Sequence, residues 1–194
     1  MSTGAVPERL ATRSPARMAR IAGFLYFLSV LTAVFNEFFA HLRLGIAGIL
    51  IPVSCQFAVT LLLYGIFRPV NKNLSSLALA SQFVALTFEV IDLQPYGINI
   101  GMAFHGVYCL LIGFLILRSA FVPRWLGVPM AVAGLIWLIY LSPPIAHYLS
   151  PYNTASGLLG EGLPMLWLLV QGVNSHRWKL QAGTTTGERL QCAS

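Results

Sequence analysis

Charged side chains are scarce in this sequence. Only 9% of its 194 residues are Asp, Glu, Lys or Arg, whereas a soluble domain carries about 25%. In their place, 57% of the residues are hydrophobic, and the mean hydropathy is +0.74. This composition excludes an ordinary soluble globular domain.

Linear motifs for catalysis and metal binding are absent as well. The three cysteines, Cys55, Cys109 and Cys192, show neither a disulfide framework nor a metal-ligand spacing. No HExxH, paired-histidine or GxSxG pattern occurs, and the short connections between the apolar runs leave no room for a soluble catalytic domain. We therefore predict no metal and no cofactor. The missing motifs favour a non-catalytic protein without deciding the question.

What the sequence does contain is a series of long apolar runs. A helix needs about 20 apolar residues to cross a bilayer, and the runs lack the period-2 alternation of barrel strands. We predict an all-α, polytopic membrane helical bundle with six transmembrane helices, at about 21–41, 44–67, 74–94, 98–117, 125–142 and 154–173. The predicted organisation is a disordered cytoplasmic tail at 1–19, a transmembrane domain at 20–180 and a second disordered cytoplasmic tail at 181–194.

The basic residues indicate the orientation of this bundle. With the N-terminus inside, eleven of the twelve Lys and Arg residues lie on the inner side, and Arg43 alone lies outside. This distribution is typical of the positive-inside rule and predicts that both termini are cytoplasmic. The net charge of +6 is therefore a topology signal and does not indicate nucleic acid. The lipid bilayer is the expected partner, and a homo-oligomer or a membrane partner protein stays open.

Polar groups on several predicted helices share one depth. Of the six acidic residues, Glu8 and Glu188 lie in the tails, and the other four lie in the outer halves of helices. At about 1.5 Å of rise per residue, three of these four and one histidine lie about 6–10 Å below the outer membrane boundary, with Asp92 nearer the surface. A charge facing lipid costs up to about 2.5–3.5 kcal/mol, so these groups are expected to face the bundle interior or an aqueous pocket. The predicted binding cluster consists of Glu37, Glu89, Asp92, His105 and Glu161, with His41, Arg43 and Tyr108 as contributors.

Each member of this cluster also has a purely structural interpretation. Glu37 can form an ion pair with His41 or Arg43, and His105 can hydrogen-bond a neighbouring helix. Asp92 can be a solvated helix end. The layer as a whole is therefore either a functional pocket or a structural polar network. Carboxylates beside a histidine can also ligate Zn²⁺, although no linear spacing supports this.

Four segments carry a family resemblance. They are ARIAGFLYFLSVL at 19–31, LYGIFRPVNKNLSSLA at 63–78, FHGVYCLLIGFLILRSAFVPRWLGVPMAVAGLIWLI at 104–139 and GEGLPMLWLLVQGVNSHRW at 160–178. The chain resembles an uncharacterised bacterial integral-membrane family, domain of unknown function 4386. The resemblance implies a multi-pass protein of the bacterial cytoplasmic membrane and brings no reaction, ligand or catalytic residue. The chain departs from the family in its short segment AHLRLG at 40–45, where relatives have a longer polar connection.

Three functions are compatible with these features. A small proton-linked transporter would use Glu89, His105 and Glu161 as an outer-leaflet polar site. A scaffold or partner subunit would use the same groups to hold helices together. The alternative is an intramembrane enzyme that acts on a lipid or isoprenoid substrate.

Overall fold

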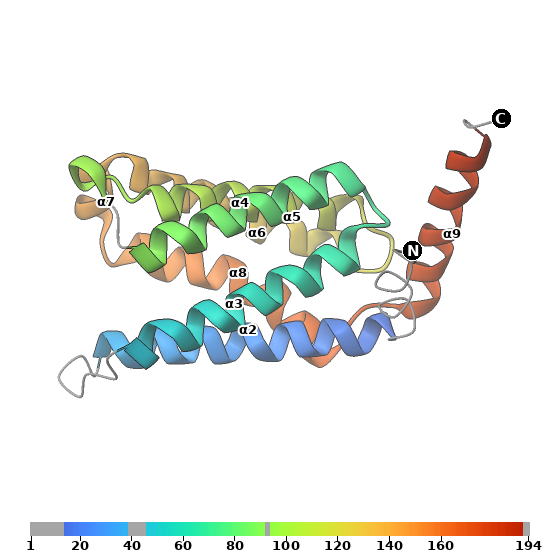
Figure 1. The fold of residues 1–194 in the computed structure, drawn as a ribbon, viewed down its shortest axis with the longest axis horizontal. Coiled ribbons are helices and arrows are strands. Elements are labelled where there is room, and N and C mark those ends of the chain that lie inside the picture. The colour runs from blue at the N-terminus through green and yellow to red at the C-terminus, as the bar shows by residue number, and fades with distance from the viewer. Residues whose placement is uncertain (1–13, 39–45, 92–93, 192–194) are drawn as a thin grey trace, which may run out of the picture.

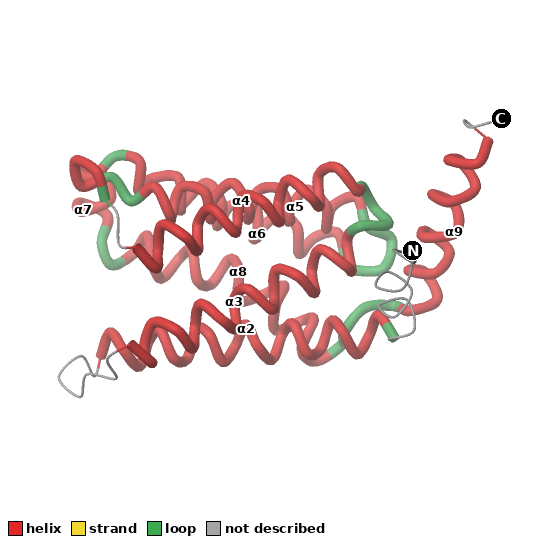
Figure 2. Tube along the Cα trace, in the orientation of Figure 1, coloured by secondary structure: helices red, strands yellow, loops and turns green. Residues whose placement is uncertain are grey.

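The computed structural model describes residues 14–38, 46–91 and 94–191, and the side chains of residues 33, 36–38, 46–49 and 184–191 are outside this description. Across these ranges the chain is helical and contains no strand (Figure 2). The α-helices are α2 (Pro15–Phe38), α3 (Ile46–Phe67), α4 (Lys72–Ile91), α5 (Ile100–Arg118), α6 (Gly127–Leu138), α7 (Pro143–Leu149), α8 (Tyr152–Val170) and α9 (Ser175–Gln191). Short 3₁₀ helices occur at Pro95–Gly97, Arg124–Leu126 and Ile139–Leu141.

Six of the helices in the described ranges pack as a closed ring. The order around the ring is α2, α3, α4, α5, α6 and α8, and α8 packs back against α2. The first five neighbouring pairs follow chain order, with the short α7 placed at one end of the bundle between α6 and α8 (Figure 1). Each ring helix therefore presents one face to a shared interior, where side chains that are distant in sequence can meet.

Four helical segments among the described residues are long and apolar enough to cross a membrane. They are Leu50–Phe67, Lys72–Ile91, Ile100–Arg118 and Arg124–Leu141. The all-α prediction is confirmed for the described residues, and these four candidate segments coincide with the second to fifth of the six predicted spans. The sixth predicted span is α8, which begins with the polar residues Asn153, Thr154 and Ser156 and also carries Glu161, so its hydropathy is lower.

The first predicted span corresponds to α2, which faces outward with apolar side chains. Phe24, Phe27 and Leu31 are 55%, 49% and 55% exposed. Large apolar side chains on an outer face are what a lipid-facing helix requires. Part of the predicted range 21–41 lies outside the described residues, and α2 is not among the four candidate spans.

The C-terminal segment differs from the predicted disordered tail. α9 runs from Ser175 to Gln191, so residues 181–191 are helical. α9 leaves the bundle at a steep angle to the ring helices (Figure 1). Its start is held by Trp178, whose indole Nε1–H donates to the carbonyl of Ile66 at 2.9 Å. Residues 1–13 of the predicted N-terminal tail lie outside the described residues.

Glycines bring α5 and α6 close together. A Cβ atom on Gly106 would lie 2.8 Å from the carbonyl oxygen of Gly134, and one on Gly134 would lie 2.7 Å from the carbonyl oxygen of Gly106. Gly113 and Gly127 form a second reciprocal pair of the same kind. Small residues at helix contacts are the usual means by which membrane helices approach closely, because lipid supplies no hydrophobic driving force between helices.

The interior divides into an apolar half and a polar half. Fully buried apolar side chains fill the end of the bundle near the loop between α3 and α4, among them Leu63, Ile66, Phe67, Leu115, Ile116 and Leu126. The opposite half contains buried polar groups, and hydrogen bonds cross between helices there. Ser29 Oγ donates to the carbonyl of Pro52, and Ser81 Oγ donates to the carbonyl of Phe104. The polar half contains the candidate site.

The start of α4 supplies a test of local stability. Asn71 precedes the helix, and its side-chain oxygen accepts a hydrogen bond from the backbone N–H of Leu74 at 3.0 Å, which satisfies one of the unpaired amides at the helix start. We expect Asn71→Ala to lower the free energy of unfolding by about 0.5–2 kcal/mol, measured by denaturant titration in detergent. Asn71→Asp retains the acceptor and should stay close to the parent protein. Equal losses for both substitutions would contradict this capping role.

Candidate functional site

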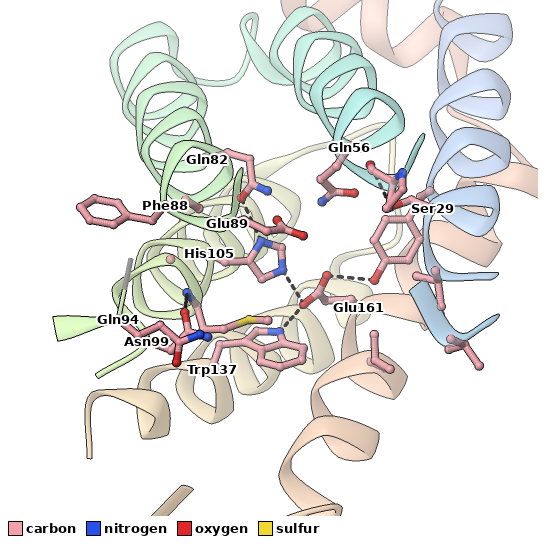
Figure 3. A pocket seen from close by; sticks show the side chains of 18 residues that line it. Ser29, Gln56, Gln82, Phe88, Glu89, Gln94, Asn99, His105, Trp137 and Glu161 are labelled. Carbon is pink, nitrogen blue, oxygen red and sulfur yellow. Dashed lines mark hydrogen bonds and ion pairs between the residues drawn. The ribbon is translucent and has the colours of Figure 1, made fainter. Parts of the chain in front are cut away.

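A cavity of about 240 Å³ lies inside the polar half of the helix ring. Each ring helix contributes to its wall, with Tyr26 from α2, Gln56 from α3, Gln82 from α4, His105 from α5, Trp137 from α6 and Glu161 from α8. Gln94 and Asn99 line it where α4 gives way to α5, so the cavity reaches toward that end of the bundle (Figure 3). Because every ring helix contributes to its wall, the cavity forms only when the whole bundle is assembled.

Glu161 is the centre of the polar cluster at this cavity. Its residue is only 2% exposed. One carboxylate oxygen, Oε2, accepts a hydrogen bond from the hydroxyl of Tyr26 at 2.9 Å. The other, Oε1, accepts from the indole Nε1–H of Trp137 and lies 3.0 Å from Nε2 of His105. The carboxylate thus links α8 to α2, α5 and α6, and each oxygen has a partner, as a buried charge requires.

His105 lies between two acceptors. Its Nδ1 is 2.9 Å from the side-chain oxygen of Gln82, and its Nε2 faces the Glu161 carboxylate. Because an amide oxygen and a carboxylate both accept, the two ring nitrogens donate to both when the imidazole carries two protons. The imidazolium and the carboxylate then form a buried ion pair of zero net charge. Neutral pairing is the arrangement that makes two charges tolerable in a membrane-embedded bundle.

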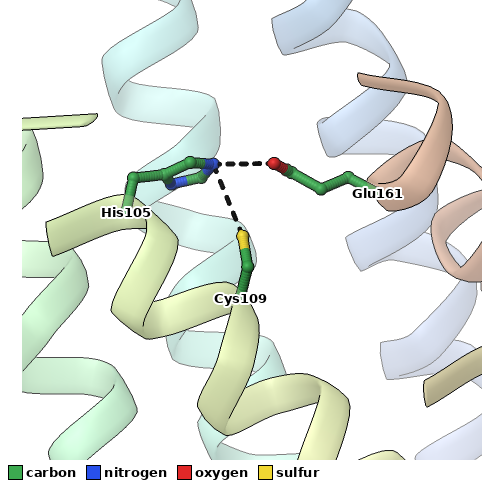
Figure 4. Close-up of side chains that lie close together, drawn as sticks. All are labelled: His105, Cys109 and Glu161. Atoms are coloured by element: carbon green, nitrogen blue, oxygen red, sulfur yellow. Dashed lines mark hydrogen bonds and ion pairs between the residues drawn. The ribbon is translucent and has the colours of Figure 1, made fainter. Parts of the chain in front are cut away.

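Cys109 adjoins this pair from one turn further along α5. Its Sγ lies 3.7 Å from Nε2 of His105, and its side chain is fully buried. One donor atom from each of His105, Cys109 and Glu161 lies within 4.8 Å of the other two (Figure 4). Imidazole nitrogen, thiolate sulfur and carboxylate oxygen are the ligand types of zinc sites. The linear sequence predicts no metal site because the third ligand comes from α8, 52 to 56 positions away from the other two.

The structure brings together only part of the predicted cluster. His105 and Glu161 are in direct contact, and Glu89 lines the same cavity as an exposed side chain on α4. Tyr108 is buried beside them, with its ring centroid 5.8 Å from that of His105. A binding role for these residues stays a prediction.

The remaining members of the predicted binding cluster have side chains outside the described part of the chain. Glu37 belongs to the last turn of α2, and its side chain is not described. Asp92, His41 and Arg43 lie outside the described residues. The pairing of Glu37 with His41 or Arg43 therefore stays a prediction as well.

Several residues of the site were not predicted from the sequence. Among them are Tyr26, Gln56, Gln82 and Trp137, which are at most 9% exposed. These four residues are uncharged, whereas the predicted cluster depends on the free-energy cost of placing charged side chains in apolar helices. A usable signal is present all the same, because a glutamine in the middle of an apolar helix must find a partner. Gln56 and Gln82 each lie inside a candidate membrane-spanning segment.

The part of the chain that contains most of this site is similar to a known protein family. The model of the domain of unknown function DUF4386 matches residues 80–172. Residues 80–172 are therefore similar to DUF4386. The DUF4386 match contains Gln82, His105, Cys109, Trp137 and Glu161, whereas Tyr26 and Gln56 precede it. The family carries no assigned activity.

A similar protein occurs in an archaeon. The chain is 29% identical to an uncharacterised protein of Archaeoglobus fulgidus, in an alignment that covers 75% of this chain and 94% of the relative. The bacterial origin implied by the resemblance is therefore not shown. No solved structure matches this chain significantly.

Proposed function

We propose that this chain is an integral membrane protein that carries a small polar solute or ion, with the cavity inside the helix ring as its binding site. The observation that carries this proposal is the position of the His105–Glu161 pair, which lines a cavity bounded by helices from the whole ring. Charged groups inside a membrane protein commonly mark substrate or ion pathways. The four apolar segments that can cross a membrane support the membrane location.

The arrangement of the interior supports a carrier with one closed side. The cavity reaches toward the α4–α5 connection, while Leu63, Ile66 and Phe67 fill the opposite half and are not exposed. A carrier in one of its two end states has this form, since its site is accessible from one side while packed side chains separate it from the other. The positive-inside distribution of basic residues supports a cavity mouth on the outer side and termini in the cytoplasm.

A scaffold role is favoured by a different observation. Glu161 is bonded to three other ring helices through Tyr26, His105 and Trp137, so the same cluster serves helix packing. A scaffold does not need to expose Gln56 alternately to the two sides of the membrane, whereas a carrier does. This difference provides a test that needs no knowledge of the solute.

The test uses a cysteine placed on the cavity wall. In a Cys55→Ser, Cys192→Ser background we expect Gln56→Cys to react with a membrane-impermeant, cationic methanethiosulfonate reagent in vesicles of both orientations. The reaction should be fast from the outer side and slower from the inner side, because the closed side opens only transiently. Labelling is measured by mass spectrometry of the intact protein, and the Cys55→Ser, Cys192→Ser protein, which retains the buried Cys109, provides the background level.

The matched control is Val59→Cys, which lies on the same helix and is fully buried. It should react from neither side. Reaction of Gln56→Cys from the outer side alone would contradict the carrier and leave the scaffold, and reaction from neither side would contradict a water-filled cavity.

A further inference from the structure

We propose that His105, Cys109 and Glu161 form a binding site for a zinc-type divalent transition-metal ion. The donor atoms are Nε2 of His105, Sγ of Cys109 and Oε1 of Glu161. This inference rests on the proposed function in one respect. It names the class of solute that the carrier would bind in its cavity.

The donor geometry lies close to what such an ion requires. Zinc bonds of about 2.0–2.3 Å in a tetrahedral arrangement place neighbouring donor atoms roughly 3.3–3.7 Å apart. In the structure Nε2 of His105 is 3.7 Å from Sγ of Cys109 and 3.0 Å from Oε1 of Glu161. The third separation is below 4.8 Å. Two of the three separations therefore lie within or close to the range of a zinc site.

The surroundings hold two of the three ligands in the orientation that metal binding needs. Metal-binding histidines almost always use their second ring N–H to donate to an acceptor, which sets the tautomer. Gln82 provides this acceptor at Nδ1 of His105 and so directs Nε2 toward Cys109 and Glu161. The hydroxyl of Tyr26 holds the other oxygen of Glu161. The helix ring thus preorganises the donors without an ion.

Charge compensation also favours an ion at this buried position. When a thiolate, a carboxylate and a neutral imidazole bind Zn²⁺, the two negative ligands balance its two positive charges, so the filled site carries no net charge. A buried site without net charge avoids the cost of burying an unpaired charge.

The ligand set indicates the class of ion. A thiolate with an imidazole selects zinc-like ions over Mg²⁺ and Ca²⁺, which take oxygen ligands. Three protein ligands leave a fourth coordination position, as in sites that exchange a bound group. His105 and Glu161 both line the cavity, so this position faces the space through which an ion arrives. A site of this kind is suited to a transported ion.

Cobalt provides a direct readout because a bond from Co²⁺ to a thiolate gives a charge-transfer band in the near ultraviolet. We expect the purified full-length protein, stripped with a chelator, to show this band on Co²⁺ titration, with one ion per chain and displacement by Zn²⁺. Because its ligands must be deprotonated, Zn²⁺ addition in weakly buffered solution should release protons. Mg²⁺ should neither displace Co²⁺ nor release protons.

Matched variants separate ligand loss from unfolding. Cys109→Ser should abolish the band and weaken Zn²⁺ binding by at least about 10-fold, while Cys55→Ser should retain both. Gln82→Leu, which touches only the second nitrogen of His105, should weaken binding by about 10–100-fold and retain the band at saturation. Far-ultraviolet circular dichroism and gel filtration check the fold of each variant, and Cys109→Ala replaces Cys109→Ser if the serine variant does not fold.

The outcomes distinguish this inference from the proposed function. Absence of the band in the parent protein, or its persistence in a folded Cys109 variant, overturns the metal site. If that occurs while Gln56→Cys still reacts from both sides, the carrier stands and its solute belongs to another class. If the band is present while Gln56→Cys reacts from one side only, the metal site stands as a resident site and the carrier is overturned.

Discussion

Replacement of Glu161 by alanine lowers the free energy of unfolding by about 3–5 kcal/mol, the expected cost of breaking a buried ion pair by removing one partner. The substitution leaves the donors of Tyr26, His105 and Trp137 without their acceptor. A buried donor that loses its partner costs about 1–3 kcal/mol, and the space left by the side chain adds to this. Denaturant titration of purified protein in detergent measures the change.

Replacement of Glu161 by glutamine has a smaller effect because one acceptor oxygen remains. That oxygen accepts from Trp137 and His105, and the new amide group donates to the hydroxyl oxygen of Tyr26. The loss of charge assistance is expected to cost about 1–2 kcal/mol. The alanine variant is therefore expected to lose more of the free energy of unfolding than the glutamine variant, because glutamine retains one acceptor oxygen.

A double-mutant cycle isolates the contact between His105 and Glu161. His105→Gln should cost at least about 1 kcal/mol less in the Glu161→Gln background than in the parent protein, since residues in one network couple by about 0.5–3 kcal/mol. Glu89→Gln is the matched control. Glu89 is an exposed acid on the cavity wall, and its substitution should change stability by no more than about 0.5 kcal/mol. Additive changes in the free energy of unfolding for the His105 and Glu161 substitutions would contradict a direct interaction between the two residues.

Two glycines on either side of Glu161 are expected to respond with opposite sign to the same substitution. A Cβ atom on Gly160 would lie 2.6 Å from the carbonyl oxygen of Pro129 and 2.9 Å from Cβ of Ala133. Both atoms belong to α6, so Gly160→Ala must push α6 and α8 apart. Overpacking of this kind costs about 1–3 kcal/mol, and the displaced α6 carries Trp137 away from Glu161.

Gly162 is the control for this substitution within the same helix. Nothing lies within 4 Å of a Cβ atom at this position, so Gly162→Ala meets no neighbour. Alanine is favoured over glycine in a helix by about 0.8–1.0 kcal/mol, and the variant should be more stable than the parent protein by up to that amount. The two variants are therefore expected to differ by about 2–4 kcal/mol in the free energy of unfolding. Equal stabilities would contradict the close approach of α6 and α8.

The class of fold and most of the helix positions follow from residue composition and spacing. Long apolar runs predict helices because a backbone in lipid must satisfy its own hydrogen bonds, and the second to fifth predicted spans coincide with candidate membrane-spanning segments. The free-energy cost of charge in lipid likewise predicts that His105 and Glu161 belong to the polar cluster, although it does not predict their direct contact. Both inferences depend on whether water or lipid solvates a side chain more favourably. This preference follows from the residue type and its position along the chain.

Tertiary structure alone decided which polar groups meet. Glu161 contacts Tyr26 and His105, which lie 135 and 56 positions away, and nothing in their local sequence states that α8 packs against α2. The closed order of the ring follows from which helices approach closely, and this depends on side-chain shape at sites such as Gly160. Depth in the membrane can be counted along one helix, whereas the direction of a side chain toward its partner is set by packing among all of them.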